Sequence, residues 1–461
     1  MTAPRIIVVG GGITGLSAAF TLQEDARRIG APLGLSVLES AATPGGHAQT
    51  IEADGFLIEA GPNGFLNREP EMLALVEALG LGPRLVTARK EANRRFILRE
   101  GRLCKVPDSP ASLVTSPALS ARGKLRLLME PFAPGPPAGE ETVHAFATRR
   151  IGREAADMLV DAAVSGISAG DSRQLSVDAQ FPIMTEMERE HGGLIRAMFA
   201  RRKTTKGKAP SLLLGFDRGM GTLTGALATR LDDALRCQSR VRAVTRAGAG
   251  AWHVRLRNGE VLEADHVVLA VPARDSAPMV AALDRTLAEA MASTVYEGIA
   301  VVALGYRVAD VPRALDGYGY LVTKPEGLTT LGCVWESSLF PGRAAEGTAL
   351  LRVFLGGARH RDIVGAPASV LIELARRELA PVMGTRAEPL HASVFSWPQA
   401  IAQYTIGHRQ RVEELRTGLA RHRGLTVCGT SYDGVSFNHA VKSGRAAARA
   451  LAEQLWDGDR A

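Results

Sequence analysis

The chain has 461 residues, of which 46% are hydrophobic and 22% charged, and its formal net charge is +7 at pH 7. This length and balance allow large cores in about two to four domains and exclude a chain that is disordered throughout. The moderate basic excess suits an anionic ligand or an anionic surface.

The sequence gives no sign of targeting segments or metal motifs. A strand is expected to start after four residues, which leaves no room for a signal peptide, and no apolar run approaches the roughly 18 residues of a spanning helix. We therefore expect a cytoplasmic protein. The four cysteines are widely scattered without a C-x-x-C pair, so we expect no metal site and no disulfide.

The first strand and the turn after it have the pattern of a dinucleotide site. Ile6–Val9 is a continuous apolar run, typical of a strand buried on both faces, and three glycines follow with the spacing G-x-G-x-x-G. In order, these glycines allow a tight turn, close approach of a pyrophosphate, and close packing of helix on strand. The helix N-terminus favours the phosphates. The predicted contacts are Gly10, Gly12, Ile13, Thr14 and Gly15.

A second strand, Leu35–Glu39, ends in an acid that lies 24 residues after Gly15. Glu39 is therefore expected to bind a ribose hydroxyl pair. A glycine-rich turn without a nucleotide is the alternative. These residues alone do not distinguish FAD from NAD.

The resemblance to a known family becomes specific between residues 43 and 65. A second glycine turn, Thr43–Thr50, leads into a hairpin of Gln49–Ile51 with Phe56–Glu59, and the segment Glu59–Phe65 reads E-x-G-P-N-x-F. Together with the first turn, these motifs resemble the flavin-containing amine oxidase superfamily and, within it, the protoporphyrinogen oxidase family. The resemblance covers nearly the whole chain and implies FAD as the cofactor.

The later elements follow the same resemblance. Helices are expected at 118–128, 142–150, 153–164 and 193–199, and strands at 298–306, 319–323, 331–335 and 350–355. A type I′ turn is expected at Asn258-Gly259. The expected fold is α/β: a discontinuous Rossmann-like FAD-binding domain, a mixed-sheet substrate domain, and a mostly helical, membrane-facing subdomain. The FAD-binding pieces are 1–88, 212–281 and 425–461, the substrate hairpin and helical subdomain span 89–211, and the substrate-binding domain spans 282–424.

The resemblance also implies further cofactor contacts. Gln49 stands where the family usually has arginine, so it offers a hydrogen bond but no charge. Val241 matches a position that holds adenine through its backbone, with a role in the strand core as the alternative. The full implied set after Glu39 is Gly45, Gly46, Gln49, Gly61, Pro62, Asn63, Val241, Trp397, Gly429, Gly434 and Val435.

Arg95 matches the family arginine that pairs with a substrate propionate. A guanidinium suits a carboxylate because it binds through two bonds and stays charged. Only the alignment, and not spacing, favours it over its neighbour Arg94, and a surface arginine is the alternative. The other implied substrate contacts are Gly166, Leu321, Val334 and Phe354, for which core packing is the competing interpretation.

The implied activity is oxygen-dependent oxidation of protoporphyrinogen IX to protoporphyrin IX, removing six electrons through FAD and forming H₂O₂. No catalytic side chain is expected, because the flavin carries the chemistry while the protein positions the substrate. Coproporphyrinogen III oxidase is the first alternative. Another amine oxidase or carotenoid desaturase of the superfamily, or a non-catalytic flavoprotein, is also left open.

The partners follow from the same analysis. The segment 201–208 carries five basic residues and no acid, and a solvated loop is favoured over contact with acidic lipid headgroups. The helical subdomain and this segment suggest peripheral docking on the inner face of the cell membrane. Ferrochelatase is an expected recipient of the poorly soluble product, and a homodimer is left open. Nucleic acid is disfavoured because no aromatic residues interleave with the charges.

Overall fold

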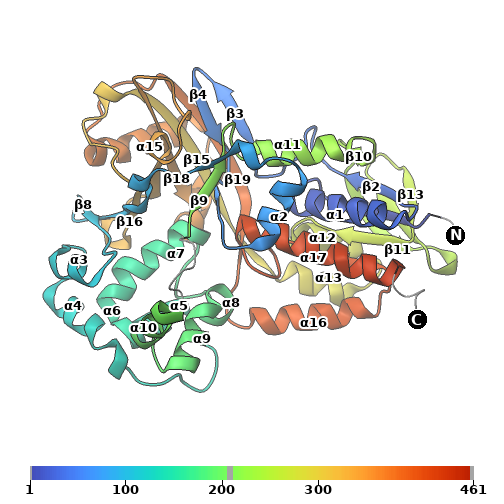
Figure 1. Cartoon of the computed structure of the whole chain (residues 1–461), viewed down its shortest axis with the longest axis horizontal. Helices are drawn as coiled ribbons and strands as arrows, with labels where there is room; N and C mark the ends of the chain where they lie inside the picture. The colour runs from blue at the N-terminus through green and yellow to red at the C-terminus, as the bar shows by residue number, and fades with distance from the viewer. Residues whose placement is uncertain (1–2, 205–210, 457–461) are drawn as a thin grey trace.

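The right-hand half of the molecule in Figure 1 is built on a five-stranded sheet. The structure is a computed structural model that describes residues 3–204 and 211–456. Across the sheet the order is β10 (Leu235–Arg236), β2 (Gly34–Leu38), β1 (Arg5–Val9), β14 (His266–Leu269) and β20 (Leu425–Val427), and every neighbouring pair is parallel. The sheet thus takes strands from each of the three distant stretches 1–88, 212–281 and 425–461.

Helices cover both faces of this sheet, which explains the uninterrupted apolar run in β1. Ile6 and Val8 are buried in one core, and Ile7 and Val9 are buried in the other. The first core is covered by α1 (Ile13–Ile29), α2 (Pro70–Ala78), α11 (Gly221–Arg230) and α17 (Phe437–Trp456), and the second by α12 (Ala273–Val280), α13 (Arg285–Ala292) and α16 (His408–Ala420).

A small antiparallel sheet of β11 (Val241–Arg246), β12 (Trp252–Leu256) and β13 (Val261–Ala264) completes the second core. The type I′ turn predicted between its last two strands is wrong. That turn needs positive φ at two residues, whereas only Gly259 (φ +94°) has it and Asn258 does not. The N–H of Gly259 donates to the carbonyl of Leu256, so the loop is a type I turn followed by a glycine bulge.

The left-hand half contains a strongly bent seven-stranded sheet (Figure 1). Its order is β19 (His391–Gln403), β15 (Val295–Arg307), β18 (Thr348–Gly356), β17 (Thr330–Trp335), β16 (Gly319–Val322), β7 (Phe96–Arg99) and β8 (Arg102–Lys105). All neighbours are antiparallel except β16 and β7. One face packs on α15 (Ala368–Met383) in a dense core. The other face is turned toward the rest of the molecule.

Two smaller sheets join the halves. They are β3 (Thr50–Ala53) with β4 (Phe56–Glu59), and β9 (Leu213–Phe216) between β5 (Phe65–Leu66) and β6 (Leu85–Thr87). The hairpin predicted after the second glycine turn is therefore present.

Residues 110–204 form a helical lobe at the lower left of Figure 1. Its helices are α3 (Pro110–Thr115), α4 (Ala121–Leu128), α5 (Val143–Ile151), α6 (Arg153–Ala155), a π-helical turn (Ala156–Val160), α7 (Asp161–Ser168), α8 (Val177–Gln180), α9 (Pro182–His191) and α10 (Leu194–Thr204). Ser120 and Thr142 cap α4 and α5, so these helices begin after the predicted starts. Residues 205–208 of the predicted basic segment 201–208 lie outside the described residues. In the described part of the chain, no helix is long and apolar enough to cross a bilayer.

Candidate active site

The glycines of the first turn differ in what they accommodate. Gly10 has a φ of +108°, and a Cβ on Gly15 would lie 1.9 Å from the Gly10 carbonyl oxygen, so helix α1 can pack on β1 only with glycine there. A Cβ on Gly12 would meet nothing within 4 Å. The space beside Gly12 is therefore open at the N-terminus of α1, where a pyrophosphate is expected.

Ile13 and Thr14, between the second and third glycines of the motif, lie in α1 close to the C-terminal helix α17. Ile13 and Thr14 are buried in the first turn of α1. A Cβ on Gly444 of α17 would lie 2.2 Å from the Thr14 carbonyl oxygen, so the two helices cross in close contact. Both ends of the chain therefore meet at this turn.

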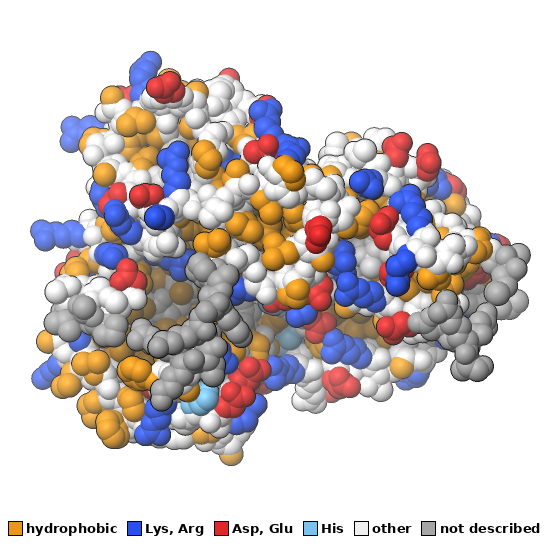
Figure 2. Space-filling model, viewed as in Figure 1, with side chains coloured by type: hydrophobic (Ala, Val, Ile, Leu, Met, Phe, Trp, Pro, Cys, Tyr) orange, Lys and Arg blue, Asp and Glu red, His pale blue; other side chains and the backbone are white. Residues whose placement is uncertain are grey.

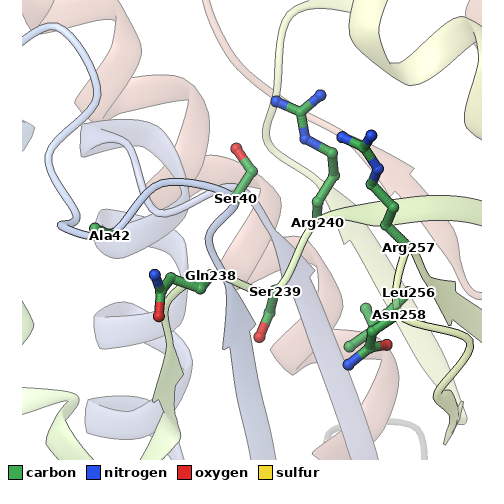
Figure 3. Close-up of a pocket in the computed structure, with 8 residues that line it drawn as sticks. All are labelled: Ser40, Ala42, Gln238, Ser239, Arg240, Leu256, Arg257 and Asn258. Carbon is green, nitrogen blue, oxygen red and sulfur yellow. The ribbon is translucent and has the colours of Figure 1, made fainter.

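Glu39 lies at the carboxyl end of β2, as predicted. Its carboxylate accepts hydrogen bonds of 2.7 Å from the backbone N–H groups of Gly11 and of Ala41. A hollow of about 540 Å³ opens next to it (Figure 3). In this hollow, Arg240 and Arg257 extend side by side, and Val241 starts β11 directly after Arg240. Its lining residues are Ser40, Ala42, Gln238, Ser239, Arg240, Leu256, Arg257 and Asn258.

The second glycine turn is joined directly to the first. The N–H of Gly45 donates to the carbonyl of Gly11 at 2.8 Å, and Gly46 lies against the Cα of Gly12. Gln49 donates from Nε2 to the Gly46 carbonyl at 2.8 Å. In this structure the Gln49 amide therefore closes its own turn.

Residues 59–63 connect the hairpin β3–β4 with the large sheet. A Cβ on Gly61 would lie 2.3 Å from the His47 carbonyl oxygen, so this loop packs tightly on the second glycine turn. Trp397 donates from Nε1 to the Ala60 carbonyl at 2.7 Å, and its ring lies 4.5 Å from that of His47. Pro62 and Asn63 follow in the same loop and are half-buried.

The loop after β20 returns to the same place. Gly429 (φ +122°) lies beside Thr14, and its N–H donates to Ser443 Oγ of α17 at 2.9 Å. The N–H of Gly434 donates to the Tyr404 hydroxyl at 2.7 Å, and Val435 follows. Gly429 is therefore brought next to the N-terminus of α1, whereas Gly434 is held by Tyr404.

The predicted substrate residues share one face of the seven-stranded sheet. On the central strand β17, Val334 is paired with Gly319 of β16 and with Arg352 of β18. Two residues earlier on β17, Gly332 is paired with Leu321 of β16 and with Phe354 of β18. Leu321 is also paired with Ile97, two residues after Arg95. Because side chains on a strand alternate with a period of two, Leu321, Val334 and Phe354 project to the same side. Arg95 lies directly before β7, and its guanidinium lies 5.7 Å from the centre of the Tyr318 ring.

Two other predicted residues border this face. Trp397 pairs with Ile299, whose other partner is Gly356, so it lies on the same side as Phe354. Gly166 of α7 opposes Leu321, because a Cβ there would lie 2.4 Å from Leu321 Cδ2. The aliphatic and aromatic side chains are half-buried, in contrast to the fully buried residues on the opposite face. The arrangement presents an apolar face with one arginine at its edge.

The sequence analysis missed three polar residues at this face: Tyr318, Glu336 and Arg352. Arg352 is buried in β18 and forms an ion pair of 2.7 Å with Glu336, and the Tyr318 hydroxyl lies 3.4 Å from the Asn63 side chain. A signal was present, since Arg352 is a lone cation in the apolar run Ala349–Leu355 and Glu336 directly follows an apolar strand. Buried charges require partners, so each should have been treated as part of a network.

Burial sets the protonation of the polar groups here. The pKa of Tyr318 is raised, chiefly by burial and against the hydrogen bond with Asn63, so its phenol stays protonated near neutral pH. The pKa of Glu59 is also raised by burial, with Arg343 opposing the shift. Burial lowers the pKa of His47, which favours a neutral imidazole beside Trp397. Among residues 3–204 and 211–456, no group of three or more His, Cys, Asp or Glu side chains could hold a metal ion.

Comparisons with known proteins agree with this geometry. The family described as flavin containing amine oxidoreductase matches residues 13–452. The chain is 30% identical to coproporphyrinogen III oxidase of Bacillus subtilis over 96% of this chain and 97% of that protein. It is 32% identical to human protoporphyrinogen oxidase, over 96% of this chain and 97% of the human protein.

Solved structures show the same fold. A crystal structure from Exiguobacterium sp. 255-15 aligns with a TM-score of 0.85 at 24% identity, covering 98% of this chain and all of that chain. Cyclohexylamine oxidase from Brevibacterium oxydans aligns with a TM-score of 0.71 at 18% identity, covering 98% and 100%. The expected mixed α/β fold and FAD as the cofactor are thereby confirmed, and the chain belongs to the flavin-containing amine oxidoreductase family.

Proposed function

We propose that the chain is an oxidase that converts protoporphyrinogen IX to protoporphyrin IX in porphyrin biosynthesis. The observation that carries the proposal is the half-buried sheet face on which Leu321, Val334, Phe354 and Trp397 lie together beside Gly166, with the exposed Arg95 at its edge. Such a face suits a large apolar macrocycle with carboxylates at its rim. Relatives named protoporphyrinogen oxidase and coproporphyrinogen III oxidase, similar over nearly their whole length, support it.

The cofactor fits the residues that lie at the junction of the two halves. The open space at Gly12, the carboxylate of Glu39 and the loop around Gly434 would hold the pyrophosphate, the ribose and the flavin side of FAD. When bound there, FAD supplies the electron acceptor. Overall, three rounds remove six electrons and six protons from the substrate, and three O₂ molecules take them up as three H₂O₂.

The chain contributes position and environment to this chemistry. Arg95 binds a propionate, and Phe354 stacks on a pyrrole ring. Leu321 and Val334 clamp another ring, and the Gly166 backbone lies beside the substrate. The apolar face excludes water and holds the reacting C–H in one orientation. This positioning of the reacting groups accelerates the reaction. No catalytic side chain is expected, because the flavin carries the chemistry.

Oxidation of coproporphyrinogen III is the second candidate, favoured by the similarity to the Bacillus subtilis enzyme. The two substrates differ in charge, since coproporphyrinogen III carries four propionates and protoporphyrinogen IX carries two. Arg95 is the one exposed cation among the predicted substrate residues, and Arg352 is buried in an ion pair with Glu336. This arrangement suits the substrate with fewer carboxylates.

Replacement of Arg95 tests the substrate assignment. With Arg95→Ala, we expect roughly 10- to 100-fold weaker binding of protoporphyrinogen IX, because a charge-assisted bond to a carboxylate is lost. Anaerobic reduction of the flavin at several substrate concentrations measures this affinity. Arg94→Ala is the matched control, since Arg94 forms an ion pair with Asp316 instead, and it should bind substrate normally.

The same measurement separates the two candidate substrates. Faster reduction of the wild-type flavin by coproporphyrinogen III than by protoporphyrinogen IX would replace the first candidate by the second. Reduction by neither porphyrinogen would reject both. An unchanged affinity in Arg95→Ala would remove the propionate role from Arg95.

The helical lobe is the proposed membrane-docking part, on the inner face of the cell membrane. Apolar side chains lie exposed on α4 and the turn after it, including Leu125 at 62% and Phe132 at 82% exposure. Hydrophobic and basic side chains lie near one another at the lower left of Figure 2, where Figure 1 places the helical lobe. Arg122 and Arg153 line a hollow of about 190 Å³ beside them. Exposed apolar groups next to cations suit the surface of an anionic bilayer.

Sedimentation with lipid vesicles tests this surface. The wild type is expected to pellet with vesicles that contain phosphatidylglycerol and less with pure phosphatidylcholine. The combined variant Leu125→Ser, Leu128→Ser and Phe132→Ser should lose most of this binding. Val261→Ser, at an exposed apolar position on β13 in the other half, is the control and should bind like the wild type. Equal binding of all three proteins would reject the surface.

A further inference from the structure

Four charged side chains are buried together beneath the loop that contains Asn63. They form two ion pairs, Glu59 with Arg343 at 3.3 Å and Glu336 with Arg352 at 2.7 Å. Arg352 also donates from Nη1 to the carbonyl of Gly61 at 2.9 Å. Burying such charges is costly unless they are paired. The two pairs differ in one respect, because only Glu336 reaches a residue at the substrate face.

That residue is Asn63. Its Nδ2 donates to Glu336 Oε1 at 3.2 Å, and its Oδ1 accepts from the Tyr318 hydroxyl at 3.4 Å. A carboxylate can only accept, so Glu336 fixes which side of the Asn63 amide carries the oxygen. Arg352 in turn holds Glu336, since one oxygen of the carboxylate meets both Arg352 and Asn63.

Asn63 and Tyr318 lie where this buried network meets the substrate face. Both are half-buried, whereas Glu336 and Arg352 are fully buried. Tyr318 packs in the same cluster as Val334, and the Arg95 guanidinium lies 5.7 Å from the centre of the Tyr318 ring. The polar groups therefore lie between the proposed propionate arginine and the loop of residues 59–63.

We propose that Glu336 is a positioning residue that orients Asn63, so that the amide oxygen, together with the Tyr318 hydroxyl, receives a pyrrole N–H of the substrate. The inference rests on the proposed function, because a porphyrinogen is a macrocycle with four pyrrole N–H donors. An acceptor with a fixed orientation holds one ring of such a molecule in register with the cofactor. Without Glu336, the amide loses the contact that fixes its orientation, because the Tyr318 hydroxyl lies 3.4 Å from both amide atoms and can donate or accept.

A double-mutant cycle tests this coupling. The variants are Glu336→Gln, Asn63→Leu and the two combined, each loaded with FAD, and the substrate dissociation constant comes from anaerobic flavin reduction by protoporphyrinogen IX. We expect each single change to raise the constant about tenfold, as for one lost hydrogen bond of this kind. The combined variant should bind no more weakly than Asn63→Leu, because Glu336 acts through Asn63. A multiplied effect of about a hundredfold would overturn the proposal.

A buried carboxylate without the Asn63 contact supplies the control. Glu59→Gln is expected to lower the midpoint of thermal unfolding, as Glu336→Gln does, but to leave the substrate dissociation constant unchanged. If Glu59→Gln weakens substrate binding as much as Glu336→Gln, the role of Glu336 is only structural and the proposal fails.

A milder variant keeps the test decisive if Glu336→Gln does not fold. Tyr318→Phe removes only the hydroxyl and keeps the ring beside Arg95, and it should raise the dissociation constant several-fold with full FAD content. No change in Tyr318→Phe would refute the proposed acceptor. These outcomes are distinct from failure of the proposed function, in which no porphyrinogen reduces the wild-type flavin at all.

Discussion

Gly12→Val is expected to fold like the wild type and to be purified without FAD. Gly12 has a φ of −75°, which a valine can adopt, and a Cβ there meets no protein atom within 4 Å. The added side chain would instead fill the space at the N-terminus of α1, where the pyrophosphate approaches the backbone. We expect FAD affinity to fall at least about a hundredfold, since the phosphates would lose close contact with several N–H groups.

Two measurements establish this result. Fluorescence titration with FAD gives the affinity, and the thermal unfolding midpoint of the cofactor-free proteins gives the stability. Gly15→Val is the contrasting variant, because its Cβ would lie 1.9 Å from the Gly10 carbonyl oxygen and the chain should not fold stably. Stoichiometric FAD in purified Gly12→Val would contradict the assignment of the turn to the cofactor.

Stability is expected to fall steeply in mildly acidic solution because of His408. Burial lowers the pKa of this residue from 6.5 to about 4. The unfolded chain therefore takes up a proton between these values while the folded chain does not. The stabilisation is full above pH 6.5 and is lost as the pH falls toward 4, a change of about 3 kcal/mol for this group.

The surroundings of His408 link this loss to the cofactor. Its ring stacks on Tyr404 at 3.8 Å, and the Tyr404 hydroxyl bonds Thr430 and Gly434 in the loop after β20. Among the charged neighbours of His408, Arg411 disfavours the protonated ring, whereas Asp433 and Glu140 favour it. Acidification should therefore release FAD as well as lower stability.

His408→Phe tests the pH dependence, because a phenyl ring can stack on Tyr404 without taking up a proton. Denaturant unfolding at about pH 7 and about pH 4.5 should show a smaller loss in this variant than in the wild type. His253→Phe, at a partly exposed position on β12, should lose as much as the wild type. The same pH dependence in His408→Phe and wild type would show that another group is responsible.

The parts of the fold set by local patterns could be predicted from the sequence. Strand β1 and its glycine turn are encoded by a buried apolar run and by close backbone contacts at Gly10 and Gly15. The glycines therefore specify geometry that few other residues allow. The helices of the lobe were also predictable, apart from α3, α8 and α9, and the starts of α4 and α5 are set by the caps Ser120 and Thr142.

Strand β19 could not be predicted, because its sequence contains Pro398 and many polar residues. Proline lacks an N–H and is tolerated here because β19 is an edge strand and the pairing with β15 shifts register between Glu297 and Ile299. Gly298 allows this shift, since a Cβ there would lie 2.8 Å from the Pro398 carbonyl oxygen. Trp397 was therefore predicted from the resemblance alone, and the strand that carries it was not predicted.

The network at the substrate face depends on contacts distant in sequence. Asn63, Tyr318, Glu336 and Arg352 come from four separate stretches, and the register of the seven-stranded sheet brings them together. A single sequence predicts alternation along each strand but not the pairing of strands. The resemblance supplied the apolar contacts and Arg95, whereas the residues that orient them required the structure.

A crystal structure of the protein with FAD and a bound tetrapyrrole tests the central claim most directly. We predict that the pyrophosphate lies at Gly12 and that the macrocycle lies on the face of Leu321 and Phe354, beside Gly166, with a propionate on Arg95. A tetrapyrrole bound elsewhere, or Arg95 and Phe354 turned away from a flavin that occupies the junction, would contradict it.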